Sequence, residues 1–113
     1  MVLRERISDT KVNKYFSQIV EILEEQLVEY NVKVYLYGSR SRNDAYDASD
    51  IDLAIQTSDL IKAELIKTKD AFFESTIPYK VDIVELNSVD ENFKENIMNE
   101  GILIWENWTK KKN

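Results

Sequence analysis

Cysteine and histidine are both absent from this 113-residue sequence, and glycine and proline are scarce, with two and one occurrences. Without cysteine the chain cannot form disulfides, thiolate nucleophiles or cysteine-based zinc sites, which fits a reducing cytoplasm. Without histidine, every mechanism that uses imidazole as acid, base or ligand is excluded. Any chemistry must therefore come from carboxylates, hydroxyls, lysines, backbone groups or a bound metal ion.

Long apolar runs and an excess of positive charge are missing as well. No segment approaches the roughly 20 apolar residues needed to span a bilayer, and the start MVLRERISDT lacks the apolar region of a signal peptide. We therefore expect a cytoplasmic protein with no membrane partner. The net charge of −6 disfavours broad nucleic-acid binding, which depends on phosphate neutralisation by lysine and arginine.

Length and composition predict a single domain over residues 1 to 113. The 43% hydrophobic and 32% charged content is typical of a globular chain and not of a disordered one. A chain of this size holds one modest core and has no room for a second, substrate-binding domain.

Helical and strand patterns alternate along the chain. Apolar residues recur every three or four positions in three segments, for which we expect helices. These segments are residues 12 to 30, 61 to 73 and 93 to 98. β-branched and aromatic runs predict strands at residues 33 to 37, 51 to 55, 80 to 86 and 102 to 105. The sequence therefore predicts an α/β (α+β) fold, a small mixed β-sheet with helices packed on it.

Candidate capping residues set the expected ends of the two later helices. Ser58 or Asp59 would open the second helix. Ser88 and Glu91 have the spacing of a capping box, which would open the third. Gly101 is placed to end that third helix in the left-handed conformation.

Two carboxylates, Asp50 and Asp52, lie two positions apart at one predicted strand. Such residues project from the same face and are separated by about 7 Å at the backbone. Magnesium prefers hard oxygen ligands and usually takes one or two carboxylates together with substrate phosphates. The pair is therefore a candidate Mg²⁺ site, and the alternative is a solvated strand face.

A third carboxylate, Asp82, lies inside the apolar strand VDIVEL. Burial of an unpaired carboxylate costs several kcal/mol or more, so a cation or hydrogen-bond donors are expected beside it. If the two strands are neighbours, three carboxylates meet on one face. Two divalent ions about 4 Å apart could then activate a hydroxyl and stabilise the leaving group of an in-line displacement. The alternative for Asp82 is an ion pair with Lys80 or a nearby basic residue.

Gly38 and Ser39 follow a predicted strand and open a polar segment that could begin a short helix. Backbone N–H groups at such a turn attract anions, glycine lets a phosphate approach closely, and serine adds a hydroxyl. Taken alone, the pair is equally consistent with an ordinary turn at the end of a strand.

These elements occur in a specific order, because GSRSRNDAYDASDIDLAI is followed by VDIVEL. The composite pattern resembles the DNA polymerase β-like nucleotidyltransferase superfamily, specifically its small, MNT-type stand-alone domains. The resemblance extends from residue 35 to about residue 105.

The resemblance implies a role for each position of the pattern. Gly38 and Ser39 would bind the triphosphate. Asp50 and Asp52 would ligate both of two Mg²⁺ ions, and Asp82 would ligate the ion that activates the acceptor hydroxyl. All three aspartates would thus be catalytic metal ligands.

Three further residues fall in the same segment. Arg40 would help to bind the phosphates, although a solvated surface position is an equally good interpretation of both Arg40 and Arg42. Asn43 stands where these small domains often carry glycine. Because asparagine tolerates the left-handed conformation, we expect the turn to form.

The resemblance also implies an activity and a partner. The expected enzyme is a metal-dependent nucleotidyltransferase, an adenylyltransferase that moves AMP from ATP to a hydroxyl. The expected partner is a HEPN-type helical protein, as in toxin–antitoxin modules, and a homodimer is the second choice. The alternative function is a noncatalytic nucleotide-binding or partner-neutralising antitoxin subunit. Retention of all three aspartates argues against it.

Overall fold

The helices and strands alternate as the sequence predicts. The computed structural model describes residues 6–108. Its elements are α1 (Thr10–Leu27), β1 (Val32–Tyr37), α2 (Ser39–Arg42), β2 (Ile51–Thr57), α3 (Lys62–Glu74), β3 (Val81–Glu85), the 3-10 turn η2 (Leu86–Ser88), α4 (Glu91–Glu100) and β4 (Ile102–Asn107). Within this part of the chain no helix is both long and apolar enough to cross a membrane.

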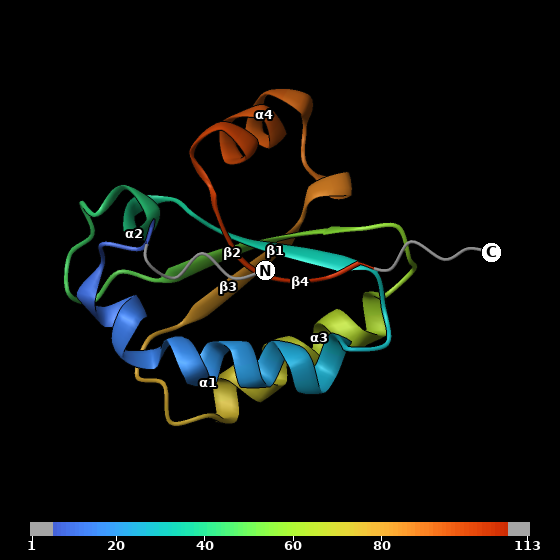
Figure 1. The fold of residues 1–113 in the computed structure, drawn as a ribbon, viewed down its shortest axis with the longest axis horizontal. Helices are drawn as coiled ribbons and strands as arrows, with labels where there is room; N and C mark the ends of the chain where they lie inside the picture. The colour runs from blue at the N-terminus through green and yellow to red at the C-terminus, as the bar shows by residue number, and fades with distance from the viewer. Residues whose placement is uncertain (1–5, 109–113) are drawn as a thin grey trace.

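Four strands form one mixed sheet in the described residues, in the order β3-β2-β1-β4. The central strand β1 is antiparallel to both β2 and β4, whereas β2 and β3 are parallel. Parallel neighbours need a long crossover, and α3 supplies it (Figure 1). The predicted α/β class with a small mixed sheet is confirmed.

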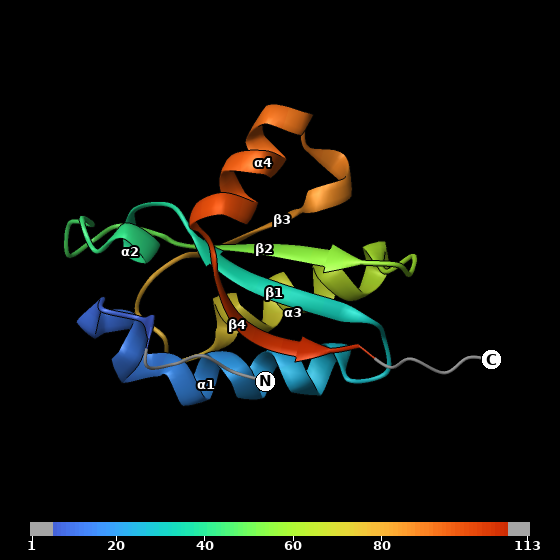
Figure 2. The same ribbon diagram turned by 45° about the horizontal axis from the view of Figure 1, so that its top comes forward.

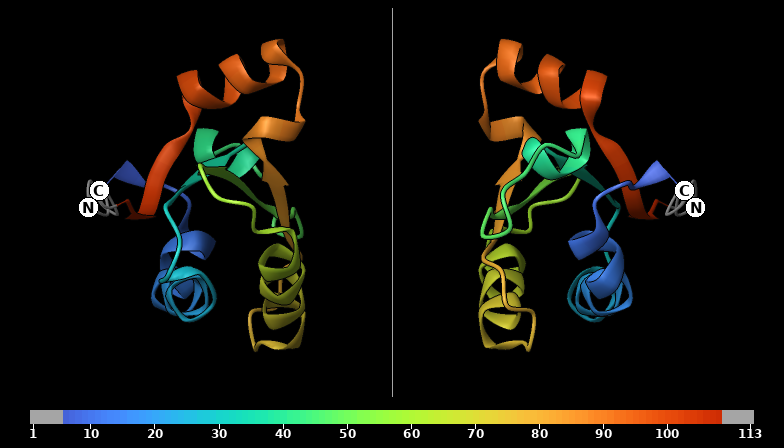
Figure 3. Two further views of the ribbon diagram at one scale, coloured as in Figure 1. Left: turned by 90° about the vertical axis from the view of Figure 1, so that its right-hand side faces the viewer. Right: turned by 90° about the vertical axis from the view of Figure 1, so that its left-hand side faces the viewer.

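Helices cover both faces of the sheet. α1 and α3 lie side by side on one face, α4 lies on the other, and α2 lies at one end (Figures 1, 2 and 3). In β2, Ile51, Leu53 and Ile55 belong to the larger core, whereas Ala54 belongs to a smaller cluster that includes Ile97 of α4. The residues that α1 contributes to the larger core are Val12, Phe16, Ile19, Leu23 and Leu27. This alternation directs the even-numbered positions of β2, including Asp52, toward the α4 face.

The predicted caps of the two later helices are wrong. α3 has no side-chain cap, and the Asp59 carboxylate instead accepts a hydrogen bond from the backbone N–H of Asn31 at 2.8 Å. α4 begins two residues later than the capping box required. Its cap is Asp90, which accepts from the backbone N–H of Phe93 at 2.8 Å, while Ser88 ends η2.

Gly101 is also not a left-handed terminator. Its backbone is extended, with φ −71° and ψ 153°. Glycine fits this position because of crowding: a Cβ atom would lie 2.5 Å from the carbonyl oxygen of Ile97. The only described non-glycine residue with positive φ is Asn43, at φ 61° and ψ 37°, so the expected left-handed turn after α2 is confirmed.

Candidate functional site

Asp52 and Asp82 are direct neighbours across the two parallel strands. Asp52 of β2 is the register partner of Asp82 of β3, and on its other side Asp52 pairs with Tyr37 of β1. Both aspartates are half-buried. The two carboxylate-bearing strands are therefore neighbours, which the sequence had left open, and their pairing places two like charges side by side.

Asp50 precedes β2 and is exposed. Within residues 6–108, none of the carboxylates of Asp50, Asp52 and Asp82 forms a hydrogen bond or an ion pair with another side chain. Among the same residues, no three Asp, Glu, His or Cys side chains lie close enough together to form a metal-binding group. The strands thus bring Asp52 and Asp82 together, whereas Asp50 lies just outside β2, and metal ligation by the three residues stays a prediction.

The electrostatic environment of Asp52 reflects this crowding. Burial raises the pKa of the Asp52 carboxyl, and the charges of Asp82 and Asp50 raise it further, whereas Arg40 and Lys80 act in the opposite direction. A carboxylate with a raised pKa lacks a compensating positive charge. Hard oxygen donors without an internal partner are the chemistry that suits Mg²⁺, so the residues present fit such an ion.

Gly38 brings the turn after β1 into contact with this acidic pair. It has φ 76° and ψ −156°, a combination that side chains rarely adopt. A Cβ atom at this position would lie 2.7 Å from Oδ2 of Asp52. The absence of a side chain therefore lets the backbone turn and the carboxylate lie against each other.

The short helix α2 begins at Ser39, as predicted for the polar segment. The carbonyl of Gly38 accepts hydrogen bonds from the backbone N–H groups of Ser41 and Arg42 at 3.1 and 3.2 Å, and from the Ser41 hydroxyl at 2.8 Å. These bonds hold the turn rigidly while Ser39 stays partly exposed next to it.

Tyr37 of β1 is a further member of the site. Burial raises its pKa to about 12, with further contributions from Asp52 and Asp82. Its ring meets that of Phe93 in α4 edge to face, with centroids 5.8 Å apart. The alternation of residues along β1 and β2 indicates which side chains share a face of the sheet. Only the observed register, however, places Tyr37 beside Asp52.

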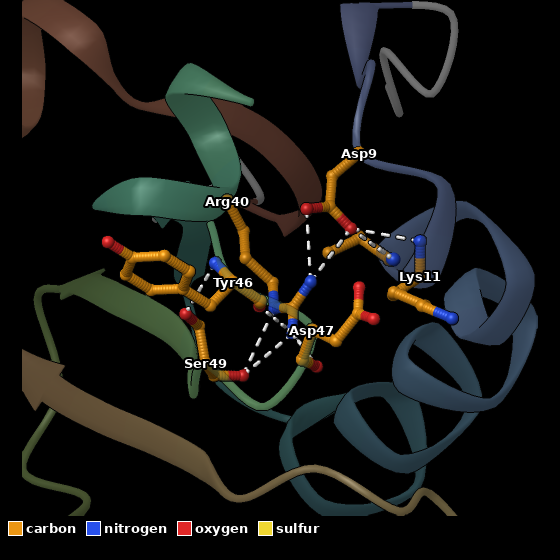
Figure 4. A network of polar contacts seen from close by, with 7 residues as sticks. Asp9, Lys11, Arg40, Tyr46, Asp47 and Ser49 are labelled. Carbon is orange, nitrogen blue, oxygen red and sulfur yellow. Dashed lines mark hydrogen bonds and ion pairs between the residues drawn. The ribbon is translucent and has the colours of Figure 1, made fainter. Parts of the chain in front are cut away.

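Arg40 occupies a different environment from the one expected of a phosphate ligand. Its side chain is 1% exposed and forms an ion pair with Asp9, with Nη1 3.0 Å from Oδ2. The guanidinium also donates to the carbonyl oxygens of Tyr46, Asp47 and Ser49 (Figure 4). Since its donors are used inside the protein, the geometry disfavours direct contact with a nucleotide. Arg42, by contrast, is exposed and pairs with Asp44 and Glu100.

A mixed sheet that presents a glycine turn beside carboxylates on two neighbouring strands defines a class of small α/β nucleotide-handling domain. Two solved structures share the fold. A toxin–antitoxin complex with AMP-PNP has a TM-score of 0.67 at 24% identity, covering 84% of this chain and 74% of that one. A tri-AMPylated Shewanella oneidensis HEPN toxin with MNT antitoxin has a TM-score of 0.61 at 22% identity, covering 82% and 71%.

Sequence comparison then identifies the family. Residues 17–110 match the family described as "Polymerase beta, Nucleotidyltransferase". The probable protein adenylyltransferase MntA of Haemophilus influenzae is 34% identical over 91 residues, covering 78% of this chain and 77% of that protein. The chain belongs to the polymerase beta nucleotidyltransferase family, and it is a nucleotidyltransferase.

Proposed function

We propose that this chain transfers AMP from Mg²⁺-bound ATP to a hydroxyl group of a HEPN-type helical partner, and thereby acts as the antitoxin of a toxin–antitoxin pair. The observation that carries the proposal is the register of β2 and β3, which sets Asp52 opposite Asp82 with Gly38 against Asp52. The name of the Haemophilus influenzae relative and the HEPN toxin bound to the structural relative support the choice of nucleotide and partner.

The glycine turn is the proposed binding place of the triphosphate. Gly38 lets the backbone of the turn lie against the Asp52 carboxylate, and the partly exposed Ser39 offers a hydroxyl beside it. A triphosphate here would lie directly against the acidic pair. Two anionic groups so close together require a cation between them, which is consistent with the absence of a basic side chain bonded to the carboxylates among the described residues.

Asp50, Asp52 and Asp82 are the residues that would hold Mg²⁺ ions. When bound, the ions supply charge neutralisation for the phosphates and for the attacking and leaving oxygens. The chain's own contribution is to hold Asp52 and Asp82 side by side on neighbouring strands, with Asp50 directly before β2. Tyr37 lies beside Asp52 in the sheet and packs its ring against that of Phe93 in α4.

The acceptor hydroxyl is proposed to come from a second protein chain. A groove of about 590 Å³ lies between the C-terminal half of α3 and the start of β3, and it reaches the sheet edge at Asp82. Its apolar lining residues are Phe72, Phe73, Ile77, Pro78, Tyr79 and Val81. Phe73 is 90% exposed. An exposed apolar lining of this kind suits contact with a protein surface, so a partner that presents a tyrosine or similar hydroxyl is favoured over a free small molecule. A homodimer remains the second choice.

The test is transfer of label from α-labelled ATP in the presence of Mg²⁺, with and without the HEPN-type partner. We expect label in the partner protein and release of pyrophosphate. Asp52→Asn should lower single-turnover transfer about 10³-fold or more, because it removes ligand charge from the reacting centre, while the thermal melt stays cooperative. Asp44→Asn, an exposed aspartate paired with Arg42, is the matched control and should transfer normally.

Two results would contradict the proposal. Wild-type transfer by Asp52→Asn would remove the carboxylate pair from the chemistry. Tight, Mg²⁺-dependent ATP binding and neutralisation of the partner without any transfer would instead identify a noncatalytic antitoxin.

A further inference from the structure

We propose that Arg40 is a positioning residue which, together with Asp9, fixes the segment leading into Asp50 and the start of β3. This inference rests on the proposed function, because it concerns the same carboxylates. Asp9, Arg40 and Tyr79 would together position the proposed metal-binding carboxylates without contacting the nucleotide themselves.

Arg40 joins its own helix to the loop that precedes Asp50. Nε donates to the Ser49 carbonyl at 3.2 Å, and Nη2 donates to the same oxygen at 2.8 Å. Nη2 also donates to the Asp47 carbonyl at 2.9 Å and to the Tyr46 carbonyl at 3.4 Å. All three carbonyls lie within the four residues before Asp50 (Figure 4). The guanidinium therefore fixes the backbone that positions this exposed carboxylate.

Asp9 connects this assembly to α1. Its Oδ1 accepts the backbone N–H groups of Lys11 and Val12, both at 2.9 Å, and so caps α1. Both of its oxygens also accept from Nη1 of Arg40, at 3.1 and 3.0 Å. Since Asp9 is 7% exposed at its side chain, the pair is shielded from solvent screening. The loop before Asp50 is therefore held against the rigid start of an 18-residue helix.

Tyr79 extends the connection toward β3. The guanidinium carbon of Arg40 lies 4.7 Å from the centroid of the Tyr79 ring, which also meets the Tyr15 ring edge to face at 6.1 Å. The next residue, Lys80, accepts the backbone N–H of Ile51 at 2.8 Å through its carbonyl. The Arg40 side chain thus contacts the segments that precede both β2 and β3, the strands that carry Asp52 and Asp82.

Only arginine suits this position. Its planar group offers five donors in a fixed arrangement and can stack on an aromatic ring, whereas lysine offers three donors at one point. Arg40→Lys keeps the charge near Asp9 but cannot reach the carbonyls of Asp47 and Ser49 at the same time. Direct phosphate binding would break several of these bonds and uncover a buried charge, which argues against it.

The experiment compares three variants of the full chain with its partner. Arg40→Lys removes the planar guanidinium and its fixed set of donors. Asp9→Asn keeps the α1 cap but removes the negative charge that pairs with Arg40. The double variant Asp9→Asn/Arg40→Met removes both charges, so that no unpaired buried charge remains and folding is favoured. We measure amide hydrogen exchange over residues 44–51 without nucleotide, and kcat and KM of transfer for Mg-ATP.

In all three variants we expect exchange over residues 44–51 to rise at least about tenfold, with a cooperative melt. We expect kcat to fall by about 10- to 100-fold, the scale of a small misplacement of reacting groups, with KM changed less than about threefold. The double variant should be no worse than Arg40→Lys, because residues in one network are not additive.

Two matched controls separate positioning from general damage. Asp90→Asn alters an aspartate that caps α4 without an arginine partner, and Arg42→Lys alters an exposed arginine of the same short helix. Because Arg42 is bonded to Asp44, the controls are compared over residues 45–51, where neither variant should change exchange. If the folded double variant exchanges and transfers like wild type, the proposal is overturned. A rise in KM confined to the Arg40 variants would make Arg40 a phosphate ligand instead.

Failure of the proposed function is recognised separately. If the wild-type chain transfers no AMP to any partner, the exchange measurement alone decides whether Asp9 and Arg40 fix residues 44–51. If wild type is active and exchange is unchanged in the variants, the positioning role fails while the function stands.

Discussion

At the scale of single residues, Gly38 is the most constrained position of the site. An alanine there would have to adopt φ 76° and would place its Cβ 2.7 Å from Oδ2 of Asp52. Residues held in such a conformation cost about 1 to 3 kcal/mol each. We predict that Gly38→Ala lowers the free energy of unfolding by this amount and lowers transfer more than about 100-fold, because the Asp52 carboxylate is displaced. Urea unfolding and single-turnover kinetics measure the two effects.

Gly101→Ala provides the comparison for this prediction. An alanine Cβ at position 101 would also clash, at 2.5 Å from the Ile97 carbonyl oxygen. The φ of Gly101 is ordinary, however, and the atoms that this Cβ would meet do not belong to Asp52. This variant should lose stability while the folded fraction keeps its transfer rate. Equal kinetic losses in the two alanine variants would show that general destabilisation, and not the position of Asp52, explains Gly38→Ala.

The pair of Asp52 and Asp82 should weaken the metal-free protein. Burial and the neighbouring carboxylates raise the pKa of Asp52, which means that its ionised form is disfavoured in the fold. Like charges directly opposite across strands are destabilising, on the scale of about 0.2 to 1 kcal/mol for cross-strand pairs. We predict that Asp52→Asn raises the free energy of unfolding by this amount at neutral pH in EDTA. Urea titration measures it.

The control for this gain is Asp44→Asn. Asp44 is exposed and has Arg42 as an ion partner, so its neutralisation relieves no repulsion and should be close to neutral in stability. A loss of stability in Asp52→Asn, with Asp44→Asn unchanged, would mean that Asp52 contributes favourable contacts to the metal-free fold.

At the scale of elements, the start of α4 distinguishes the observed cap, Asp90, from the predicted cap, Ser88. Asp90, and not Ser88, accepts the N–H of Phe93 at the start of the helix. Replacement of a capping aspartate by alanine costs about 0.5 to 2 kcal/mol. We predict this loss for Asp90→Ala and a change within about 0.5 kcal/mol for Ser88→Ala. Thermal or urea unfolding of the two variants decides between the predicted capping box and the observed cap.

The strands, and the direction in which Asp52 projects from β2, could be predicted because both depend on local periodicity. Ile51, Leu53 and Ile55 alternate with Asp52 and Ala54, which sets the two faces of β2 without any knowledge of its neighbours. The adjacency of β2 and β3 followed from the sequence only as a condition, because strand order is a property of the whole sheet. The register that pairs Tyr37 with Asp52 did not, because it depends on how the sheet packs as a whole.

Interactions between distant segments could not be predicted in the same way. Asp59 is a residue type that often caps helices, yet its carboxylate accepts the backbone N–H of Asn31, which precedes β1 at the same end of the sheet. Arg40 follows Gly38 and Ser39 as a phosphate ligand would, and nothing in the sequence connects it with Asp9. Such partners are determined by tertiary packing, which overrides local preference.

At the scale of the whole molecule, the net charge of −6 makes the divalent ion decisive for nucleotide binding. ATP alone is an anion approaching an acidic protein, and the ion removes that repulsion. Mg-ATP at about 100 times its Kd should stabilise the fold by about 2.7 kcal/mol. For a domain of this size the melting temperature then rises by about 10 °C. Scanning calorimetry with Mg²⁺, ATP and both together tests this.

Only the combination should give the full shift, and Asp52→Asn should abolish it. An equal shift with ATP in EDTA would show that the nucleotide binds without the ion, and the acidic residues would then have another purpose.

The parallel pairing of β2 with β3 also determines when the site comes into existence during synthesis. β1 and β2 can pair as soon as both have left the ribosome, and they bring Gly38 and Asp52 together. Asp82 joins them only after all of α3 has been made and the crossover has closed, and such non-local pairing is the slow part of folding. A nascent chain therefore brings Gly38 against Asp52 before it brings Asp82 beside them, and the proposed site is completed only when the sheet is nearly finished.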